Sequence, residues 1–318
     1  MIKTYMLSAL TAFALSFLFC RILIPVLRKL KAGQNILVYV AEHKNKGGTP
    51  TMGGIAFIFA ATLTSILFFP RLQKPFVLAL AVGLAYMGVG VLDDFLKWRH
   101  KQNLGLRAWQ KLSFQVVIAI FVGIYCAKAG LTTVNIPFLN ARINIGLWML
   151  PLSVLVFLST VNAVNLTDGL DGLAAGVSIP FFSFFGILTA LQNTGGGLAI
   201  ISFALAGALV AYLLFNVFPA SVFMGDTGSL SLGGFAACIA LFSGNALYIL
   251  LVGACFVFSV ISVLIQVIYY KATGGKRVFL MAPVHHHFQK KGYSEGKIAC
   301  AYFVTTLVLG IICLLTVM

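Results

Sequence analysis

Residues 172–191 read GLAAGVSIPFFSFFGILTAL and residues 198–218 read LAIISFALAGALVAYLLFNVF, and neither stretch contains an Asp, Glu, Lys or Arg. Apolar stretches of about 20 residues are long enough to cross a bilayer as α-helices. The rest of the chain is similar, because 60% of its 318 residues are hydrophobic and only 9% are charged. Soluble domains average about 25% charged residues. The sequence therefore predicts a single all-α, polytopic membrane domain over residues 1–318.

Ten stretches have the length and apolarity of membrane-spanning helices. They are residues 4–27, 53–69, 76–92, 112–130, 147–164, 172–191, 198–218, 228–243, 246–270 and 297–317. Sixteen Lys and Arg residues fall in 28–46, 97–111 and 271–297, against five on the opposite side. Cytoplasmic loops are enriched in Lys and Arg, so we expect these three segments to be cytoplasmic and both termini to be outside. The external residues 131–146 alternate in polarity and predict a short hairpin.

All five aspartates lie at the ends of these apolar stretches, in a chain with only seven acidic residues. Asp93 and Asp94 close the stretch 76–92, next to Lys97. They could belong to a solvated helix end, but an acid at a helix C-terminus opposes the helix dipole. Carboxylates at membrane depth are unfavourable and are usually functional. Because adjacent helical residues point about 100° apart, we expect one to bind a metal and the other a second group.

A second cluster lies in NAVNLTDGLDGL, residues 162–173. Asp168 or Asp171 could cap the following helix, because an aspartate accepts hydrogen bonds from free N–H groups at a helix start. One acid would be enough for a cap, however. The segment holds two acids and two asparagines, the second of which is Asn165, at three-residue intervals. The pattern favours a set of polar ligands for a substrate or a metal.

Asp226 lies in FMGDTGSL, residues 223–230, just before the stretch 228–243. It too could simply cap a helix. The alternative is a Mg²⁺ ligand beside a helix N-terminus, where the free N–H groups also attract phosphate. Asn216 and Phe223 would then frame the pocket.

Two further cytoplasmic segments contain candidate ligands. The run His285-His286-His287 could bind zinc, form a neutral surface loop, or hydrogen-bond a pyrophosphate. In KGGTPTMGG, residues 46–54, Thr51 could cap a helix, or Lys46 and free backbone N–H groups could hold a phosphate. The net charge of +15 fits either anionic lipid headgroups or a polyanionic substrate. Together these motifs indicate magnesium-dependent phosphoryl chemistry at the cytoplasmic membrane surface, with no nucleic-acid partner.

Five motifs in this order resemble one known family. KGGTPTMGG, LDDFLK, NAVNLTDGLDGL, FMGDTGSL and APVHHHF are together similar to the phospho-N-acetylmuramoyl-pentapeptide transferases, which belong to the polyprenyl-phosphate hexosamine-1-phosphate transferases. The resemblance covers residues 43–292. It implies transfer of phospho-MurNAc-pentapeptide from its UDP carrier to undecaprenyl phosphate, giving lipid I and UMP. It also implies Mg²⁺, a cytoplasmic-face cleft, a homodimer, and the bacterial cytoplasmic (inner) membrane as the location.

The resemblance carries roles over to particular positions. It implies catalytic roles for Asp93, Asp94, Asp226 and His285, magnesium binding by Asp226 and Asp168, and substrate contacts by Lys46, Thr51, Lys97, Lys111, Asn165, Asp168, Asp171, Asn216, Phe223, Gln266, His286 and His287. Which of the paired acids is the base stays open, as does the choice between direct transfer and an aspartyl-phosphate intermediate.

The chain departs from the family pattern in the histidine run, which is followed by Phe288-Gln289 where relatives commonly have a glutamate. An alternative activity is transfer of GlcNAc-1-phosphate to the same lipid, but the histidine run and Pro50-Thr51-Met52-Gly53 favour the muramoyl substrate. A transporter with intramembrane acids is disfavoured, because its sites lie near the midplane and often in repeated halves.

Overall fold

The computed structural model describes residues 1–30, 48–69, 71, 73–100, 105–139, 141–194 and 196–317. Lys46, a predicted substrate residue, lies outside this part of the chain.

Helices form where the apolar stretches predict them. They are α1 (Ile2–Lys29), α2 (Gly54–Phe68), α3 (Lys74–His100), α4 (Ala108–Lys128), α5 (Met149–Thr167), α6 (Leu173–Leu191), α7 (Gly196–Asn216), α8 (Gly225–Phe242), α9 (Tyr248–Val252), α10 (Ala254–Ala272), α11 (Val284–Lys290) and α12 (Glu295–Leu315). Nine helices of the described part are long and apolar enough to cross a membrane. This confirms an all-α, polytopic membrane protein.

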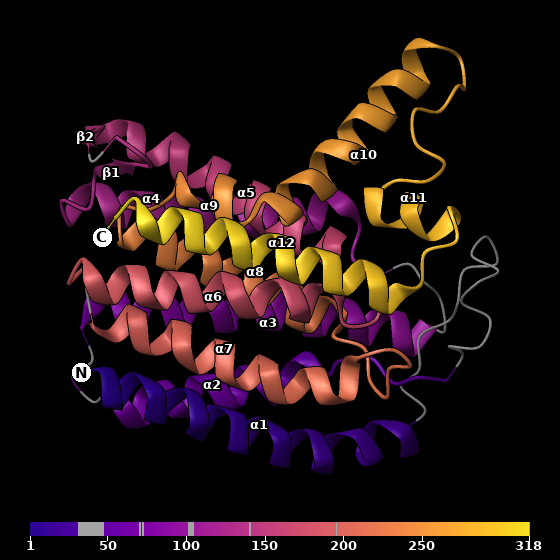
Figure 1. Ribbon diagram of the computed structural model, residues 1–318, viewed down its shortest axis with the longest axis horizontal. Helices are drawn as coiled ribbons and strands as arrows, with labels where there is room; N and C mark the ends of the chain where they lie inside the picture. The colour runs from indigo at the N-terminus through magenta and orange to yellow at the C-terminus, as the bar shows by residue number, and fades with distance from the viewer. Residues whose placement is uncertain are drawn as a thin grey trace.

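Three of the predicted spans differ from the helices observed. The predicted span 76–92 forms α3, which continues to His100, so Asp93 and Asp94 lie inside this helix and not at its end as predicted. The predicted span 53–69 forms α2, which has only 15 residues and is the one apolar helix of 10–17 residues in the described ranges. The predicted span 246–270 is broken at Gly253 into the short α9 and the long α10. Beyond this break α10 leans away from the other helices, and residues 273–283 return from its far end to α11 (Figure 1).

Helix α8 lies in the middle of the bundle, between α3 and α5 (Figure 1). Every residue from Thr227 to Phe242 is buried. Small residues let the neighbouring helices approach closely, as is common between membrane helices. A Cβ on Gly233 would lie 2.5 Å from the Cα of Val161 in α5, and one on Gly234 would lie 2.5 Å from the Tyr86 ring in α3. The tight packing fixes the first turn of α8 relative to both neighbours.

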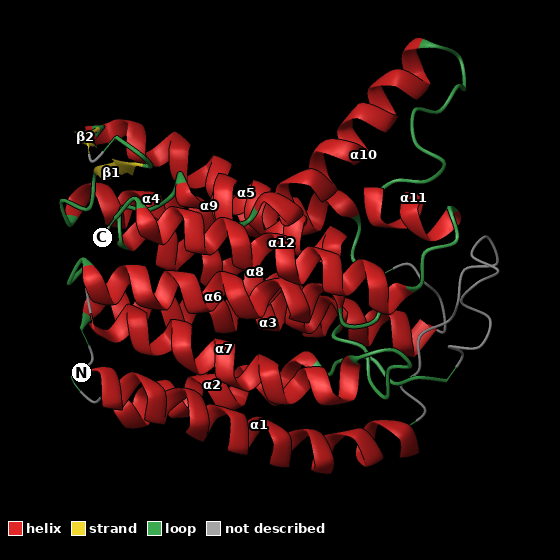
Figure 2. Cartoon of the chain, in the orientation of Figure 1, coloured by secondary structure: helices red, strands yellow, loops and turns green. Residues whose placement is uncertain are grey.

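The predicted hairpin is present at one end of the bundle. Strands β1 (Thr133–Ile136) and β2 (Ala141–Asn144) pair antiparallel, with Val134 opposite Ile143 (Figure 2). The Asn135 amide donates to Asn245 Oδ1 at 2.8 Å, which ties β1 to the turn after α8. Both chain termini lie at this end (Figure 1).

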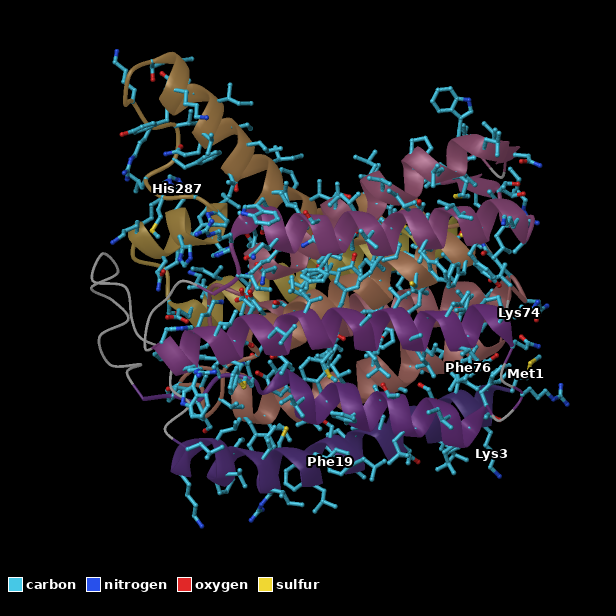
Figure 3. All side chains as sticks on the ribbon, turned by 180° about the vertical axis from the view of Figure 1, so that it is seen from behind. Met1, Lys3, Phe19, Lys74, Phe76 and His287 are labelled. Atoms are coloured by element: carbon cyan, nitrogen blue, oxygen red, sulfur yellow. The ribbon has the colours of Figure 1, made fainter. Side chains whose placement is uncertain are left out.

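The opposite end of the bundle carries the histidine run. Figure 3 shows His287 there, at the end opposite Met1, Lys3 and Lys74. The last turn of α3, with Lys97, Arg99 and His100, and the short α11 lie at this same end. Most of the predicted site residues therefore gather at the end of the bundle that lies away from the hairpin.

Candidate active site

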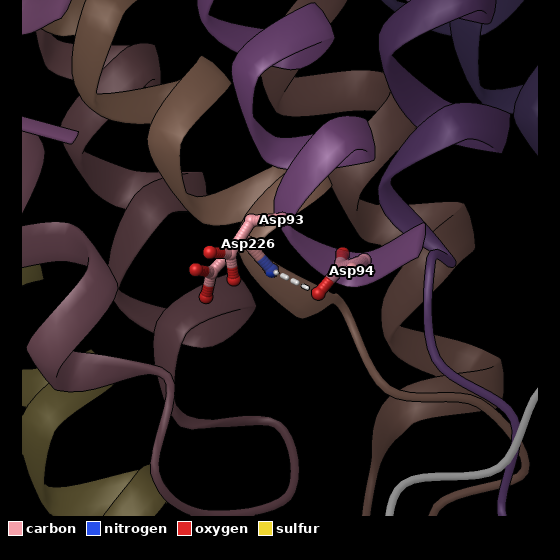
Figure 4. Close-up of side chains that lie close together, drawn as sticks. All are labelled: Asp93, Asp94 and Asp226. Carbon is pink, nitrogen blue, oxygen red and sulfur yellow. Dashed lines mark hydrogen bonds between the residues drawn. The ribbon is translucent and has the colours of Figure 1, made fainter. Parts of the chain in front are cut away.

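Three carboxylates meet where the C-terminal part of α3 packs against the start of α8. Asp93 and Asp94 come from α3, and Asp226 comes from the first turn of α8 (Figure 4). One carboxylate oxygen from each lies within 4.8 Å of the others. The two motifs are 132 residues apart in sequence between Asp94 and Asp226, so only the packing of α3 against α8 brings them together.

A glycine allows this close approach. A Cβ on Gly90, one turn before Asp94, would lie only 2.2 Å from the carbonyl oxygen of Asp226. The backbones of α3 and α8 therefore touch directly at the level of the acids.

Replacing Gly90 by alanine is expected to push the two helices apart at this point. Overpacking of a buried contact usually costs about 1–3 kcal/mol, and the displaced carboxylates should lower activity by about tenfold or more. Gly88→Ala is the matched control in the same helix, because a Cβ there would meet nothing within 4 Å. Thermal unfolding and turnover of both variants would test this. Equal behaviour of the two would show that the contact is not important.

Asp94 caps helix α8 from the neighbouring helix. Its Oδ2 accepts hydrogen bonds from the Thr227 N–H at 3.0 Å and the Thr227 hydroxyl at 2.7 Å, and its Oδ1 accepts from the Asp226 N–H at 3.3 Å. The free N–H groups at a helix start attract negative charge. Asp94 is 2% exposed. Both of its oxygens are thus bound to groups that cannot rotate away.

Asp93 is bound by lysines and by one backbone group. Its Oδ2 lies 2.7 Å from Lys97 Nζ and its Oδ1 lies 2.9 Å from Lys111 Nζ. The Leu106 N–H donates to Oδ1 at 2.7 Å. The lysine side chains are 24% and 22% exposed, so they can move toward solvent or toward a ligand.

Asp226 connects the two lysines to the last turn of α5. Its Oδ2 lies 3.4 Å from Lys97 Nζ and forms a short ion pair with Lys111. Its Oδ1 accepts from the Asn165 side-chain amide at 2.9 Å, and the same amide donates to Ser229 Oγ. With 13% of its side chain exposed, Asp226 is the most accessible of the three acids.

Several predicted site residues hold the backbone around this cluster. Asp171 accepts a hydrogen bond from the Ala220 N–H at 2.9 Å, and Asn216 bonds both the Gly172 N–H and the Val222 carbonyl. Phe223 pairs its backbone with Pro50 and Gly53 at 2.8 and 2.9 Å. These contacts hold the Asp-Gly loop, the segment before α8 and the start of α2 against one another.

Thr51 and Asp168 lie close to the carboxylate cluster without belonging to it. Thr51 is 7% exposed, and its Oγ1 would lie 2.7 Å from a Cβ on Gly225, as Asp94 Oδ2 would at 2.4 Å. Asp168 is half-buried just beyond the end of α5. Burial, followed by the charges of Asp226 and Asp94, raises the pKa of Asp168 well above its usual value. Asp168 is not among the three acids whose oxygens meet.

Two of the three histidines face the Asp-Gly loop. A Cβ on Gly169 would lie 2.6 Å from His285 Nε2 and 2.9 Å from His286 Nε2. His285 is fully buried, and both of its ring nitrogens lack a hydrogen-bond partner among the described residues. Burial lowers the pKa of His285 to about 3, so this ring is neutral at physiological pH.

His287 and Gln266 instead shape the segment between α10 and α11. His287 Nδ1 accepts from the Leu280 N–H at 3.1 Å, and its ring contacts Phe279. Gln266 Oε1 accepts from the N–H groups of Val278 and Phe279 at 3.2 and 2.9 Å. Neither contact places these side chains in the carboxylate cluster.

The donor set of the cluster fits a magnesium ion. Mg²⁺ takes oxygen ligands and is usually held by one or two carboxylates together with substrate phosphates. Three carboxylates within 4.8 Å provide such oxygens, and the two lysines beside them would neutralise phosphate charge.

Comparison with known proteins places this site in a family. Residues 76–244 match the family model described as glycosyl transferase family 4. The chain is 43% identical over 310 residues to the phospho-N-acetylmuramoyl-pentapeptide-transferase of Clostridium botulinum strain Alaska E43 / Type E3, with 97% of this chain and 95% of the relative covered. The chain belongs to the phospho-N-acetylmuramoyl-pentapeptide-transferase family.

Other members of the phospho-N-acetylmuramoyl-pentapeptide-transferase family are similarly close. The enzyme of Clostridium perfringens strain SM101 is 46% identical over 289 residues, covering 90% of this chain and 88% of the relative. That of Caldanaerobacter subterraneus subsp. tengcongensis is 41% identical over 311 residues, covering 97% of each. Family membership and the nine apolar helices identify the chain as a multi-pass bacterial membrane transferase.

Sequence reasoning missed some residues that the structure ties to this site. Gln115 of α4, one turn from Lys111, accepts a side-chain hydrogen bond of 2.7 Å from Asn162, which belongs to the predicted set of polar ligands. Glu295 is buried beside the Asp-Gly loop and accepts from the Asp171 N–H. The rarity of acids in this chain, which singled out the aspartates, could also have singled out Glu295.

Proposed function

We propose that this protein transfers phospho-MurNAc-pentapeptide from UDP-MurNAc-pentapeptide to undecaprenyl phosphate, giving lipid I and UMP. Two facts support the proposal: the names of relatives that match nearly the full chain, and the meeting of three carboxylates and two lysines at one end of the bundle. The cluster of carboxylates and lysines is the observation that supports the reaction type, because phosphoryl transfer depends on positioning and on neutralising phosphate charge.

In this proposal Asp226, with Asp168 from the neighbouring loop, would hold Mg²⁺, which when bound supplies positive charge to the diphosphate. Lys97 and Lys111 leave the acids to contact phosphate oxygens, since both lysine side chains are partly exposed. Asn165 keeps Asp226 oriented through its 2.9 Å hydrogen bond. His285 Nε2 faces the same loop, and among the described residues neither ring nitrogen of this buried histidine has a hydrogen-bond partner. A buried polar group without a partner is unfavourable, which supports a substrate contact there.

We propose Asp93 as the acid that orients the lipid phosphate or takes a proton from it. When the lysines move to the substrate, the carboxylate of Asp93 loses its two charged partners. Asp94 keeps its nearest partners, because they are the backbone and hydroxyl of the α8 start, whereas Lys97 Nζ lies 3.9 Å from its Oδ1. Asp94 is then the residue that positions α8 rather than the base.

The finer features of the fold belong to this proposal. We propose ten membrane spans, with α2 as the short one and α9 joined to α10, in one domain over residues 1–318. Both termini would be outside, so that the cluster opens from a cleft at the cytoplasmic surface. The chain ends lying together beside the hairpin support an even number of spans (Figure 1). We further propose a homodimer, by family membership.

The test is UMP release by the purified protein given UDP-MurNAc-pentapeptide and undecaprenyl phosphate. We expect turnover with Mg²⁺, none after chelation by EDTA, and recovery when Mg²⁺ is restored, because the carboxylates need a hard cation. UMP release from UDP-GlcNAc but not from the muramoyl substrate would overturn the substrate assignment. A phosphorylated enzyme trapped without lipid would select the two-step route.

A further inference from the structure

Glu295 is a buried acid that none of the roles above uses. It is the first residue of α12 and is 8% exposed. Its Oε2 accepts from the Asp171 N–H at 2.9 Å, and its Oε1 accepts from the Gln289 side-chain amide at 3.3 Å. A carboxylate in the first turn of a helix also interacts favourably with the helix dipole. Glu295 therefore connects α12, the Asp-Gly loop and α11.

The hydrogen bonds continue from Gln289 to the histidine run. Gln289 and His286 lie one turn apart on α11, and His286 Nδ1 lies 3.0 Å from Gln289 Oε1. Residues three apart on a helix are neighbours on its surface. A continuous chain of side chains thus runs from Glu295 through Gln289 to His286.

Glu295 decides the direction of every hydrogen bond in this chain. An ionised carboxylate can only accept, so the NH₂ group of Gln289 must face Glu295. The carbonyl of the same amide then faces His286, and Nδ1 of His286 must carry the hydrogen. In the neutral imidazole ring the other nitrogen, Nε2, is then an acceptor. This is the nitrogen that faces Gly169 in the Asp-Gly loop.

We propose that Glu295, acting through Gln289, is a positioning residue that sets the tautomer of His286. In its neutral form the His286 ring then presents Nε2 as an acceptor for a hydroxyl or N–H group of the nucleotide-sugar substrate. The identity of that substrate rests on the proposed function, but the tautomer does not. The second bond of Glu295, to the Asp171 N–H, holds the loop that carries Gly169 at a fixed place in front of the ring.

Replacing Glu295 by glutamine inverts the hydrogen-bond chain. The new side chain keeps its carbonyl on the Asp171 N–H and turns its NH₂ toward Gln289. The Gln289 amide must then rotate and present its own NH₂ to His286 Nδ1. The His286 ring then adopts the other tautomer, in which Nε2 carries the hydrogen and is a donor. Glu295→Gln keeps the shape of the side chain and lies outside the carboxylate cluster. It would nevertheless change Nε2 of His286 from an acceptor into a donor.

The direct measurement is ¹⁵N NMR of the full-length protein in nanodiscs, with ¹⁵N-labelled histidine. His286 is assigned by its loss in His286→Asn, and spectra are recorded at about pH 8.5, where an imidazole of ordinary pKa is neutral. We expect the Nδ1–H form in the wild type, the Nε2–H form in Glu295→Gln, and a mixture in Gln289→Met. Gln289→Met also keeps the proposal testable if Glu295→Gln fails to fold.

Kinetics supply an independent readout. We expect the KM for UDP-MurNAc-pentapeptide to rise about tenfold in Glu295→Gln and in Gln289→Met, with kcat within about threefold, because one hydrogen bond in the substrate complex changes polarity. The double variant should be no worse than either single variant, since both act through the same nitrogen. Ser294→Ala is the control, because it removes the α12 cap and leaves the chain from Glu295 to His286 intact.

The outcomes separate this inference from the proposed function. An Nε2–H form in the wild type, an unchanged tautomer in Glu295→Gln, or a changed tautomer in Ser294→Ala would each overturn the inference. If the wild type releases no UMP while the tautomers change as expected, the proposed function fails and the positioning role of Glu295 stands. If the wild type releases UMP normally and Glu295→Gln leaves the tautomer of His286 unchanged, the proposed function stands and the positioning role of Glu295 fails.

Discussion

Asp226→Asn is expected to lower the rate of UMP release by about two orders of magnitude or more, as the loss of a principal electrostatic group at a reaction centre often does. Asp226 is the acid that touches both lysines and the amide of Asn165, and it is the most accessible of the three. The asparagine side chain has the same shape but carries no charge for a cation.

The fold of Asp226→Asn should survive, because Asp93 still pairs with both lysines and Asp94 still caps α8. Thermal unfolding within a few degrees of the wild type would confirm this. Asn144→Asp is the matched control, since it makes the reverse exchange at an exposed position of the hairpin, where the side chain accepts from the Gly146 N–H. Turnover of Asp226→Asn within about threefold of the wild type would refute its assigned role.

Asp94→Asn is expected to reduce both turnover and stability. The NH₂ group of the asparagine must face either the Thr227 or the Asp226 N–H, so that two donors oppose each other in a buried place. An unsatisfied buried polar group costs about 1–3 kcal/mol. Because the start of α8 then shifts and takes Asp226 with it, we expect activity to fall by about two orders of magnitude or more.

The stability loss separates a capping role for Asp94 from a purely chemical one. Unfolding of Asp94→Asn and Asp226→Asn in the same detergent should show the former clearly less stable. Thr227→Val removes one hydroxyl donor and should be intermediate, with a loss of about 1 kcal/mol, while Thr227→Ser keeps the hydroxyl and should resemble the wild type. An Asp94→Asn protein as stable as the wild type but inactive would reassign Asp94 to the chemistry.

The helices were predictable because the length of an apolar stretch determines whether it can span a bilayer. Hydropathy carries no information on helix direction, however. The stretch 246–270 carries no charged residue in sequence, and the break at Gly253 and the lean of α10 depend on packing against other helices (Figure 1). The length of α2 was overestimated because residue 69, although apolar, lies beyond the helix end.

The meeting of Asp93, Asp94 and Asp226 could be anticipated from the rarity of acids and their places at the ends of apolar stretches. The separate roles of the site residues could not be anticipated, because they depend on which groups each oxygen contacts. From the sequence alone, Asp171, Gln266 and Asn165 are equally good candidates for substrate contacts. In the structure the first two bind backbone N–H groups, and Asn165 binds a carboxylate of the cluster. The roles of the individual residues in catalysis stay predictions.

The short helix α2 changes how far a lipid must move to reach the acids. Its 15 residues rise about 22 Å, against a hydrocarbon thickness of about 30 Å. Phe59, Leu63 and Leu67 on its outer face are exposed to the lipid, so the leaflet beside them must thin to match. Headgroups there sink toward Thr51, at the depth of the carboxylates. The phosphate of a polyprenyl phosphate can therefore reach the carboxylates by lateral diffusion in the thinned leaflet beside α2. It does not first have to move out of the membrane to the ends of the longer neighbouring helices.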